Sequence, residues 1–127
     1  MAPTTKVKAH KILIVEDEAS YRALLQSILR KVGHNCIACI NGDQAVEKLK
    51  KEQFDLIIID YLLPGPNALD VIRWARQQNI KTPFFVITAY PSEHLSHHCE
   101  ALGNVTLLIK LDFELSKLPA FIAEKMG

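Results

Sequence analysis

Cysteine, long apolar runs and an excess of charge of one sign are all scarce in this sequence. Its three cysteines show no regular spacing, which argues against a disulfide scaffold and favours reduced thiols in the cytoplasm. No apolar run reaches the roughly 18 residues of a membrane span, and residues 1–10 lack the apolar segment of a signal peptide. The formal net charge is only +1, so we expect neither membrane binding nor direct nucleic acid binding.

What the chain does contain is an alternation of short apolar runs with segments of helical period. Its 127 residues, 49% of them hydrophobic and 23% charged, suit a single globular domain. Alternation of this kind is typical of βαβ units around a parallel sheet. The apolar runs, which we predict to be strands, are 11–15, 35–40, 56–59 running into Asp60, 83–88 and 105–110.

Each apolar run is followed by a predicted helix with a recognisable start or end. In the first helix, apolar residues recur at helical spacing over 21–32, and Gly33 ends it. The second helix, expected to be the shortest, is capped by Asp43. The remaining signals are Asn67, Ser92 and Ser116 as caps of the last three helices, Gly103 near the end of the fourth, and Pro119 in the first turn of the fifth.

These patterns predict an α/β fold. The expected architecture is a doubly wound, five-stranded parallel sheet in the flavodoxin-like order 2-1-3-4-5, with helices on both faces. The unbroken apolar run 56–59 supports this architecture, because a strand covered on both faces lacks the alternation of a half-exposed strand. We place the domain at residues 11–127 and interpret residues 1–10 as a flexible N-terminal tail.

Polar side chains stand where four of the predicted strands end. Glu16 and Asp17 follow the first strand, Asp60 ends the third, Thr88 the fourth and Lys110 the fifth. Parallel strands joined by helical crossovers end on one edge of the sheet, and a doubly wound sheet has its ligand crevice at that edge. We therefore expect these five residues to surround one crevice.

The residue types at this edge favour phosphoryl chemistry. Three carboxylates at short range repel one another unless a cation neutralises them, and Mg²⁺ prefers oxygen ligands while leaving room for a phosphoryl oxygen. Asp60 is then the expected nucleophile, as carboxylates are when they form aspartyl phosphates. Thr88 offers a hydroxyl donor and Lys110 a positive charge to the phosphoryl oxygens.

The sequence resembles the receiver domain of bacterial response regulators, the CheY-like family. The matching segments are ILIVEDE at 12–18, DLIIIDYLLPG at 55–65, VITAY at 86–90 and LIK at 108–110. The resemblance implies a phosphoacceptor domain of a two-component system or phosphorelay, phosphorylated on Asp60 by a histidine kinase or phosphotransfer protein. It also implies that Mg²⁺ is held by Asp17, Asp60, the backbone carbonyl of Leu62 and, through water, Glu16.

The resemblance further implies a conformational switch. Thr88 and Lys110 are expected to sense the phosphoryl group, and a downstream protein is expected to bind the fourth helix, fifth strand and fifth helix. Tyr90 and Leu107 complete the expected switch residues. Such a domain is not a metabolic enzyme, and only weak self-phosphorylation and self-dephosphorylation are expected of it.

Two leucines depart from the family pattern. Leu107 stands where the family commonly has a switching aromatic residue, so the coupling is expected to be weaker or to pass through Tyr90. Leu111 follows Lys110 where the family usually has a proline after a cis bond; without proline a cis bond costs about 3 kcal/mol, and the isomer of the Lys110–Leu111 bond stays open. These departures support an alternative, a divergent receiver that acts as a phosphorylation-independent protein-interaction module.

Other motifs lead to weaker hypotheses. A flavodoxin-like cofactor site is disfavoured, because the turn EDEAS at 16–20 is acidic and would repel a cofactor phosphate. Cys36 and Cys39 lie three apart on a predicted strand, so their side chains point to opposite faces and no redox pair is expected. His94 and His98 have the i, i+4 spacing of a transition-metal pair, but a solvated helix face is the preferred interpretation.

Overall fold

The computed structural model describes residues 8–126, along which strands and helices alternate. A short 3-10 helix at Leu115–Lys117 precedes the last α-helix. The strands and α-helices are β1 (Lys11–Val15), α1 (Ala19–Lys31), β2 (Asn35–Cys39), α2 (Gly42–Lys51), β3 (Leu56–Asp60), α3 (Ala68–Gln77), β4 (Phe84–Thr88), α4 (Glu93–Leu102), β5 (Val105–Ile109) and α5 (Leu118–Met126).

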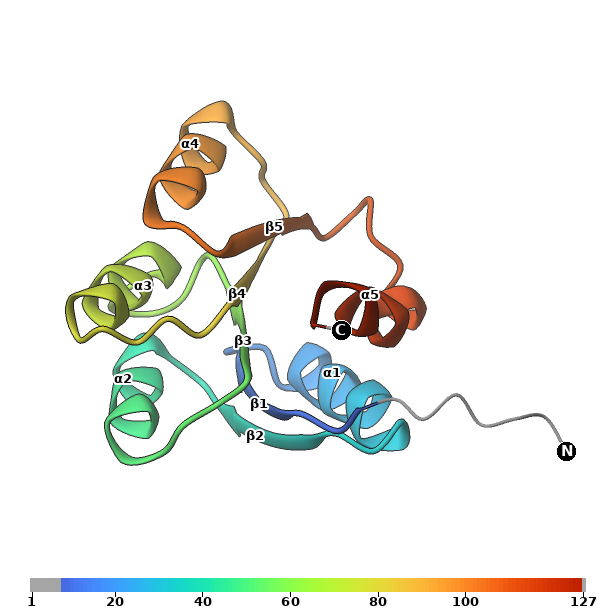
Figure 1. Cartoon of the computed structure of the whole chain (residues 1–127). Coiled ribbons are helices and arrows are strands. Elements are labelled where there is room, and N and C mark those ends of the chain that lie inside the picture. Colours follow the sequence, from blue (N-terminus) through green and yellow to red (C-terminus); the bar gives the residue numbers. More distant parts are fainter. Residues whose placement is uncertain (1–7, 127) are drawn as a thin grey trace, which may run out of the picture.

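The strands form one parallel sheet in the order β2-β1-β3-β4-β5. Helices α1 and α5 cover one face of the sheet, and α2, α3 and α4 cover the other (Figure 1). The predicted fold class and strand order are therefore confirmed. Since β1 and β3 are neighbours, with Val15 opposite Ile59, the residues that follow these two strands lie close together.

The central strands β1 and β3 are buried on both faces. Ile14 and Ile58 belong to the hydrophobic cluster shared with α1 and α5, whereas Val15 and Ile59 belong to the cluster shared with α2, α3 and α4. All four side chains are at most 1% exposed. The unbroken apolar run of β3 is thus explained by two covering layers, and it forms a rigid support for Asp60 at its end.

Two of the predicted helix caps are confirmed by their hydrogen bonds. The side chain of Asn67 accepts a hydrogen bond from the backbone N–H of Asp70, and the Asp70 carboxylate accepts one from the N–H of Asn67, which completes a capping box at the start of α3. Ser92 Oγ accepts a hydrogen bond from the N–H of Leu95 at the start of α4. Gly103 ends α4, as predicted.

The predicted starts of α2 and α5 are wrong in detail. Asn41 caps α2 through a hydrogen bond from the N–H of Gln44 to its side chain, because its extended backbone aims the amide oxygen at the first turn; Asp43 lies inside that turn. Ser116 lies within the 3-10 helix and does not cap α5. With nine residues α5 is shorter than the ten-residue α2, although Pro119 does lie in its first turn.

The N-terminal boundary differs slightly from the expected one. Residues 1–7 of the expected tail lie outside the described residues, and Lys8 and Ala9 are exposed. His10 is buried, and its backbone N–H donates a hydrogen bond to His34 Nδ1 at 3.0 Å. The two imidazole rings stack with their centroids 5.6 Å apart. His10 therefore belongs to the folded domain.

The cysteines are buried free thiols on different sides of the sheet. Cys36 packs in the cluster beneath α1 and α5, and Cys39 packs in the opposite cluster. The two side chains therefore point to opposite faces of the sheet, as predicted. Within residues 8–126, no helix combines the length and apolar character that crossing a bilayer requires.

Candidate functional site

Three carboxylate side chains meet at the carboxyl edge of the sheet. Glu16 and Asp17 directly follow β1, and Asp60 is the last residue of the neighbouring strand β3. One oxygen from each carboxylate lies within 4.8 Å of the other two. The structure therefore brings together the three acids that the sequence predicted at one crevice.

Glu16 is the buried member of this acidic cluster and is only 2% exposed. Its Oε2 accepts a hydrogen bond from the backbone N–H of Glu18 at 3.1 Å, whereas its Oε1 is buried with no hydrogen-bond partner among the described residues. Burial raises the pKa of Glu16 to about 7, and the nearby charge of Asp60 adds to the rise. Negative charge at this position is thus poorly compensated by the protein alone.

Asp60 is half-buried and lies close to the buried Glu16 and the exposed Asp17. Burial raises its pKa to about 6, the charge of Asp17 contributes to the rise, and the Lys110 ammonium opposes it. At neutral pH the Asp60 carboxylate is therefore mostly ionised while still lying among other acids. An ionised carboxylate in such a place has a strong tendency to bind a cation.

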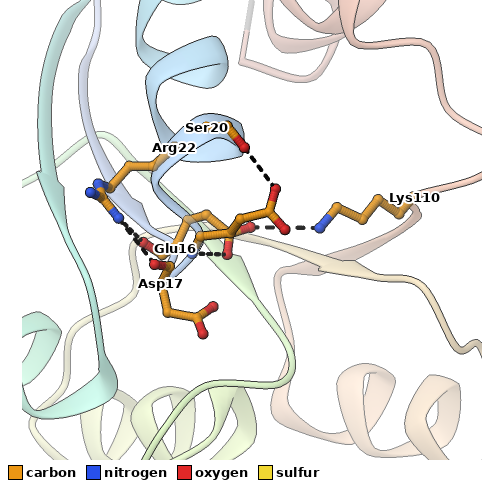
Figure 2. A network of polar contacts seen from close by, with 6 residues as sticks. Glu16, Asp17, Ser20, Arg22 and Lys110 are labelled. Atoms are coloured by element: carbon orange, nitrogen blue, oxygen red, sulfur yellow. Dashed lines mark hydrogen bonds and ion pairs between the residues drawn. The ribbon is translucent and has the colours of Figure 1, made fainter.

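The loop that carries Glu16 and Asp17 is held by Arg22 of α1. The Arg22 guanidinium donates hydrogen bonds to the backbone carbonyls of Glu16 at 2.9 Å and Asp17 at 3.3 Å. Figure 2 shows Arg22 and Lys110 approaching this loop from opposite sides, with the Asp17 carboxylate directed away from both. The guanidinium thus fixes the backbone of the loop without binding the side-chain carboxylate of Glu16 or Asp17.

Lys110 reaches the acidic cluster from the end of β5. Its backbone N–H donates a hydrogen bond to the carbonyl of Thr88 at 2.7 Å, and its Nζ lies 3.8 Å from Glu16 Oε1. The same Nζ lies 3.9 Å from the centroid of the Tyr21 ring on α1. The described residues contain no cis peptide bond, so the Lys110–Leu111 bond is trans.

Thr88 ends β4 at the same edge of the sheet. Its side chain is almost fully buried, and its Oγ1 accepts a hydrogen bond from the backbone N–H of Tyr90 at 3.1 Å. Two of the predicted switch residues are thus in direct contact. The Tyr90 side chain itself is exposed.

The other two predicted residues, Leu62 and Leu107, differ in their exposure. Leu62, two residues after Asp60, has an exposed side chain. Leu107 lies within β5 and packs, half-buried, against the cluster formed by α2, α3 and α4. In the sheet Leu107 pairs with Val86 of β4, two residues before Thr88.

A comparison with protein-family models matches residues 12–123 to the response regulator receiver domain. The chain belongs to this family. Receiver domains are the phosphoacceptor modules of two-component signalling, so the predicted function class is confirmed, and the family is one of signalling domains rather than metabolic enzymes.

Individual relatives support the assignment of this receiver domain. The chain is 37% identical over 83 residues to the alkaline phosphatase synthesis transcriptional regulatory protein PhoP of Bacillus subtilis; the match covers 65% of this chain and 35% of PhoP. The structure of the chemotaxis protein CheY4 of Vibrio cholerae superposes with a TM-score of 0.83 at 26% identity, covering 92% of this chain and 98% of CheY4. The chain thus spans about a third of PhoP and nearly all of CheY4.

The carboxylates of this receiver domain suit Mg²⁺. Three hard oxygen donors converge, one buried Glu16 oxygen lacks a hydrogen-bond partner among the described residues, and the pKa values of Glu16 and Asp60 are raised; all three features fit a divalent cation with oxygen ligands. The receiver domain of the sensor histidine kinase PA1611 of Pseudomonas aeruginosa was solved with a magnesium ion coordinated in its active-site cleft. It superposes on this chain with a TM-score of 0.81 at 24% identity, covering 94% of this chain and 99% of that domain.

Arg22 and Tyr21 are the two site residues that sequence reasoning missed. In the sequence, Tyr21 is one of the apolar positions that recur at helical spacing in α1, and Arg22 is a basic residue on the solvent-facing side of that helix. Their spacing from Asp17 is the available signal, since a helix that starts right after the acidic loop places its first turns beside that loop. The Tyr21 ring contacts Lys110, and Arg22 binds two backbone carbonyls. No pattern in the sequence indicates either contact.

Proposed function

We propose that this receiver domain accepts a phosphoryl group on Asp60 and uses Mg²⁺ to do so. The observation that carries the proposal is the convergence of the Glu16, Asp17 and Asp60 carboxylates within 4.8 Å. Asp17, Asp60 and the backbone carbonyl of Leu62 would hold the ion directly, and Glu16 would hold it through water. Bound Mg²⁺ would neutralise charge on the carboxylates and on the incoming phosphoryl group.

The transfer step requires Asp60 to act as the nucleophile. An ionised Asp60 oxygen attacks phosphorus, and a new O–P bond forms as the bond between phosphorus and the donor breaks. The electron pair of that broken bond leaves with the donor, which is an imidazole nitrogen for a phosphohistidine or a carboxylate oxygen for acetyl phosphate. The product is an acyl phosphate on Asp60, which water can hydrolyse to restore the carboxylate.

The signal is then transmitted from the phosphoryl group to the surface. Thr88 Oγ1 and the Lys110 ammonium would bind the phosphoryl oxygens. The hydrogen bond from the Tyr90 N–H to Thr88 Oγ1 supports a link from this event to the loop before α4. Leu107 of β5, packed beneath α4, completes the route. The downstream protein is expected to bind the surface formed by α4, β5 and α5.

The expected donor is a histidine kinase or phosphotransfer protein, and we place the domain in the cytoplasm. The buried free thiols support a reducing compartment. We expect no direct contact with nucleic acid or membrane from this domain.

The proposal is tested by incubating the chain with acetyl phosphate and Mg²⁺ and measuring its intact mass. We expect a single phosphoryl addition that is absent from Asp60→Asn and absent when a chelator removes the cation. Asp112→Asn, an exposed aspartate in the loop after β5, is the matched control and should be labelled like the parent chain. Addition to Asp60→Asn at the parent level contradicts the assignment of Asp60.

The same experiment distinguishes the phosphoacceptor proposal from the alternative, a phosphorylation-independent interaction module. It is favoured by Leu107 and Leu111, which replace residues that the switch of the family commonly uses. Under this alternative the intact mass does not change in either protein, with or without Mg²⁺.

A further inference from the structure

The Lys110 ammonium is held at one side of the acidic cluster. Its Nζ lies over the Tyr21 ring, 3.9 Å from the centroid, and pairs with Glu16 Oε1 at 3.8 Å. The described residues show no ion pair between Lys110 and Asp60. An aromatic face and a neighbouring carboxylate, rather than the phosphoacceptor, therefore fix the position of the ammonium.

The Tyr21 ring is well placed to hold a cation. It stands in the first turn of α1 and packs, half-buried, against the cluster beneath α1 and α5, so its orientation is fixed by neighbouring side chains. Burial and the charges of Glu16 and Asp60 raise its pKa to about 12, which keeps the phenol neutral at physiological pH. A neutral aromatic face attracts an ammonium through its quadrupole.

The backbone of Lys110 is anchored while its side chain keeps a choice of position. The hydrogen bond from the Lys110 N–H to the Thr88 carbonyl, at 2.7 Å, joins the ends of β5 and β4. The lysine side chain has a flexible stem of four carbons, and it is 25% exposed. The ammonium can therefore move from the Tyr21 ring toward Asp60 without displacement of the strand.

We propose that Tyr21 is a positioning residue for Lys110. In the unphosphorylated domain the ring holds the ammonium beside Glu16. When a phosphoryl group is present on Asp60, its oxygens attract the ammonium, and Lys110 leaves the ring. The release step rests on the proposed function, whereas the resting contact does not. Tyr21 therefore competes with the phosphoryl group for Lys110 and opposes the phosphorylated state.

The resting contact is tested by the proton NMR shifts of the Lys110 ε-methylene group. Protons that lie over a ring face are shifted upfield by the ring current. Tyr21→Phe keeps the ring and serves as the matched control, and Tyr21→Leu keeps an apolar side chain without a ring. We expect the upfield shift in the parent chain and in Tyr21→Phe, and its loss in Tyr21→Leu. Equal shifts in all three proteins overturn the proposal.

The release step is tested by titration with beryllofluoride in excess Mg²⁺, a probe that mimics a phosphoryl group on an aspartate. At saturation the Lys110 ε-methylene protons of the parent chain should reach the position seen in Tyr21→Leu. Because no ring competes for the ammonium, Tyr21→Leu should be half-saturated at about two- to fivefold lower beryllofluoride concentration. The Tyr61 amide, next to Asp60, reports the saturation, and Tyr21→Phe should match the parent chain.

A double-mutant cycle with Lys110→Met separates positioning from packing. In the Lys110→Met background there is no ammonium to release, so Tyr21→Leu should leave the beryllofluoride midpoint unchanged. An equal effect of Tyr21→Leu in both backgrounds overturns the proposal, because Tyr21 would then act through packing alone.

Failure of the proposed function would give a different result. If beryllofluoride shifts no amide around Asp60 in the parent chain, the phosphoacceptor function and the release step both fail. The upfield shift of the Lys110 protons in the free protein would still support the resting contact with Tyr21.

Discussion

Replacing Asp60 by asparagine should stabilise the domain at neutral pH when no divalent cation is present. Burial, together with the charge of Asp17, raises the pKa of Asp60 from 3.8 to about 6, despite the opposing charge of Lys110. The folded state therefore holds the Asp60 proton more tightly than the unfolded state does. The resulting stabilisation is fully present below about pH 4 and is lost as the pH rises through about 6.

The magnitude follows from the size of the pKa change. One pKa unit corresponds to about 1.4 kcal/mol, so ionisation of Asp60 costs the folded domain at most about 3 kcal/mol above pH 6. Asp60 is half-buried, and solvent screening reduces the expected cost to about 1–2 kcal/mol. Asparagine has the same shape and does not ionise. For a domain of this size, the change should raise the melting temperature by roughly 3–8 °C.

The assay is thermal unfolding of the parent chain and of Asp60→Asn in a chelator at pH 4 and at pH 7.5. We expect the two proteins to differ by less at pH 4 than at pH 7.5, where the variant should be the more stable. Asp112→Asn should show no such gain. Added Mg²⁺ should raise the melting temperature of the parent chain more than that of Asp60→Asn. A variant that is equal to or less stable than the parent chain at pH 7.5 in chelator refutes the reasoning.

Three further predictions concern the stability of the fold and the surroundings of the site. Arg76→Met should lower the free energy of unfolding by about 2–3 kcal/mol, since the guanidinium donates hydrogen bonds to the carbonyls of Ile80, Thr82 and Gly103; an unchanged urea midpoint contradicts this. Gly42→Ala should lower the free energy of unfolding by about 1–3 kcal/mol and slow labelling by acetyl phosphate. The reason is that the alanine Cβ would lie 2.5 Å from the Pro66 carbonyl oxygen in the β3–α3 loop. Stability and labelling equal to those of the parent chain would contradict this prediction. Leu62→Asn should shorten the lifetime of the aspartyl phosphate, because an exposed apolar side chain two residues after Asp60 is replaced by a polar one that can orient water; equal decay of the intact-mass signal in both proteins would refute it.

The strands and several helix caps could be predicted from the sequence, because each of these signals lies within one short segment. The run 56–59 predicted a strand covered on both faces, because a strand buried on two sides shows no alternation of apolar and polar residues. Asp60 at the end of this run predicted an acid at the crevice. The capping residue Asn67 was also readable, since its partner Asp70 lies three residues away.

The details that escaped prediction depend on geometry between segments or on a shift of one or two residues. Asn41 and Asp43 are both good capping residues, and only the extended backbone of Asn41 decides between them. His10 appeared to belong to a tail because its partner, His34, lies 24 residues away in sequence. The contact between Tyr21 and Lys110 joins α1 to the end of β5, and no local pattern encodes it.

A crystal structure of the domain grown with Mg²⁺ and beryllofluoride would test the assignment of Asp60 as phosphoacceptor most directly. We predict beryllium bonded to an oxygen of Asp60 and one Mg²⁺ ligated by Asp17, Asp60 and the Leu62 carbonyl at about 2.1 Å. The Lys110 ammonium should lie against a fluorine atom rather than over the Tyr21 ring. A structure in which Mg²⁺ binds away from Asp60, or in which beryllofluoride leaves Asp60 unmodified, contradicts the account.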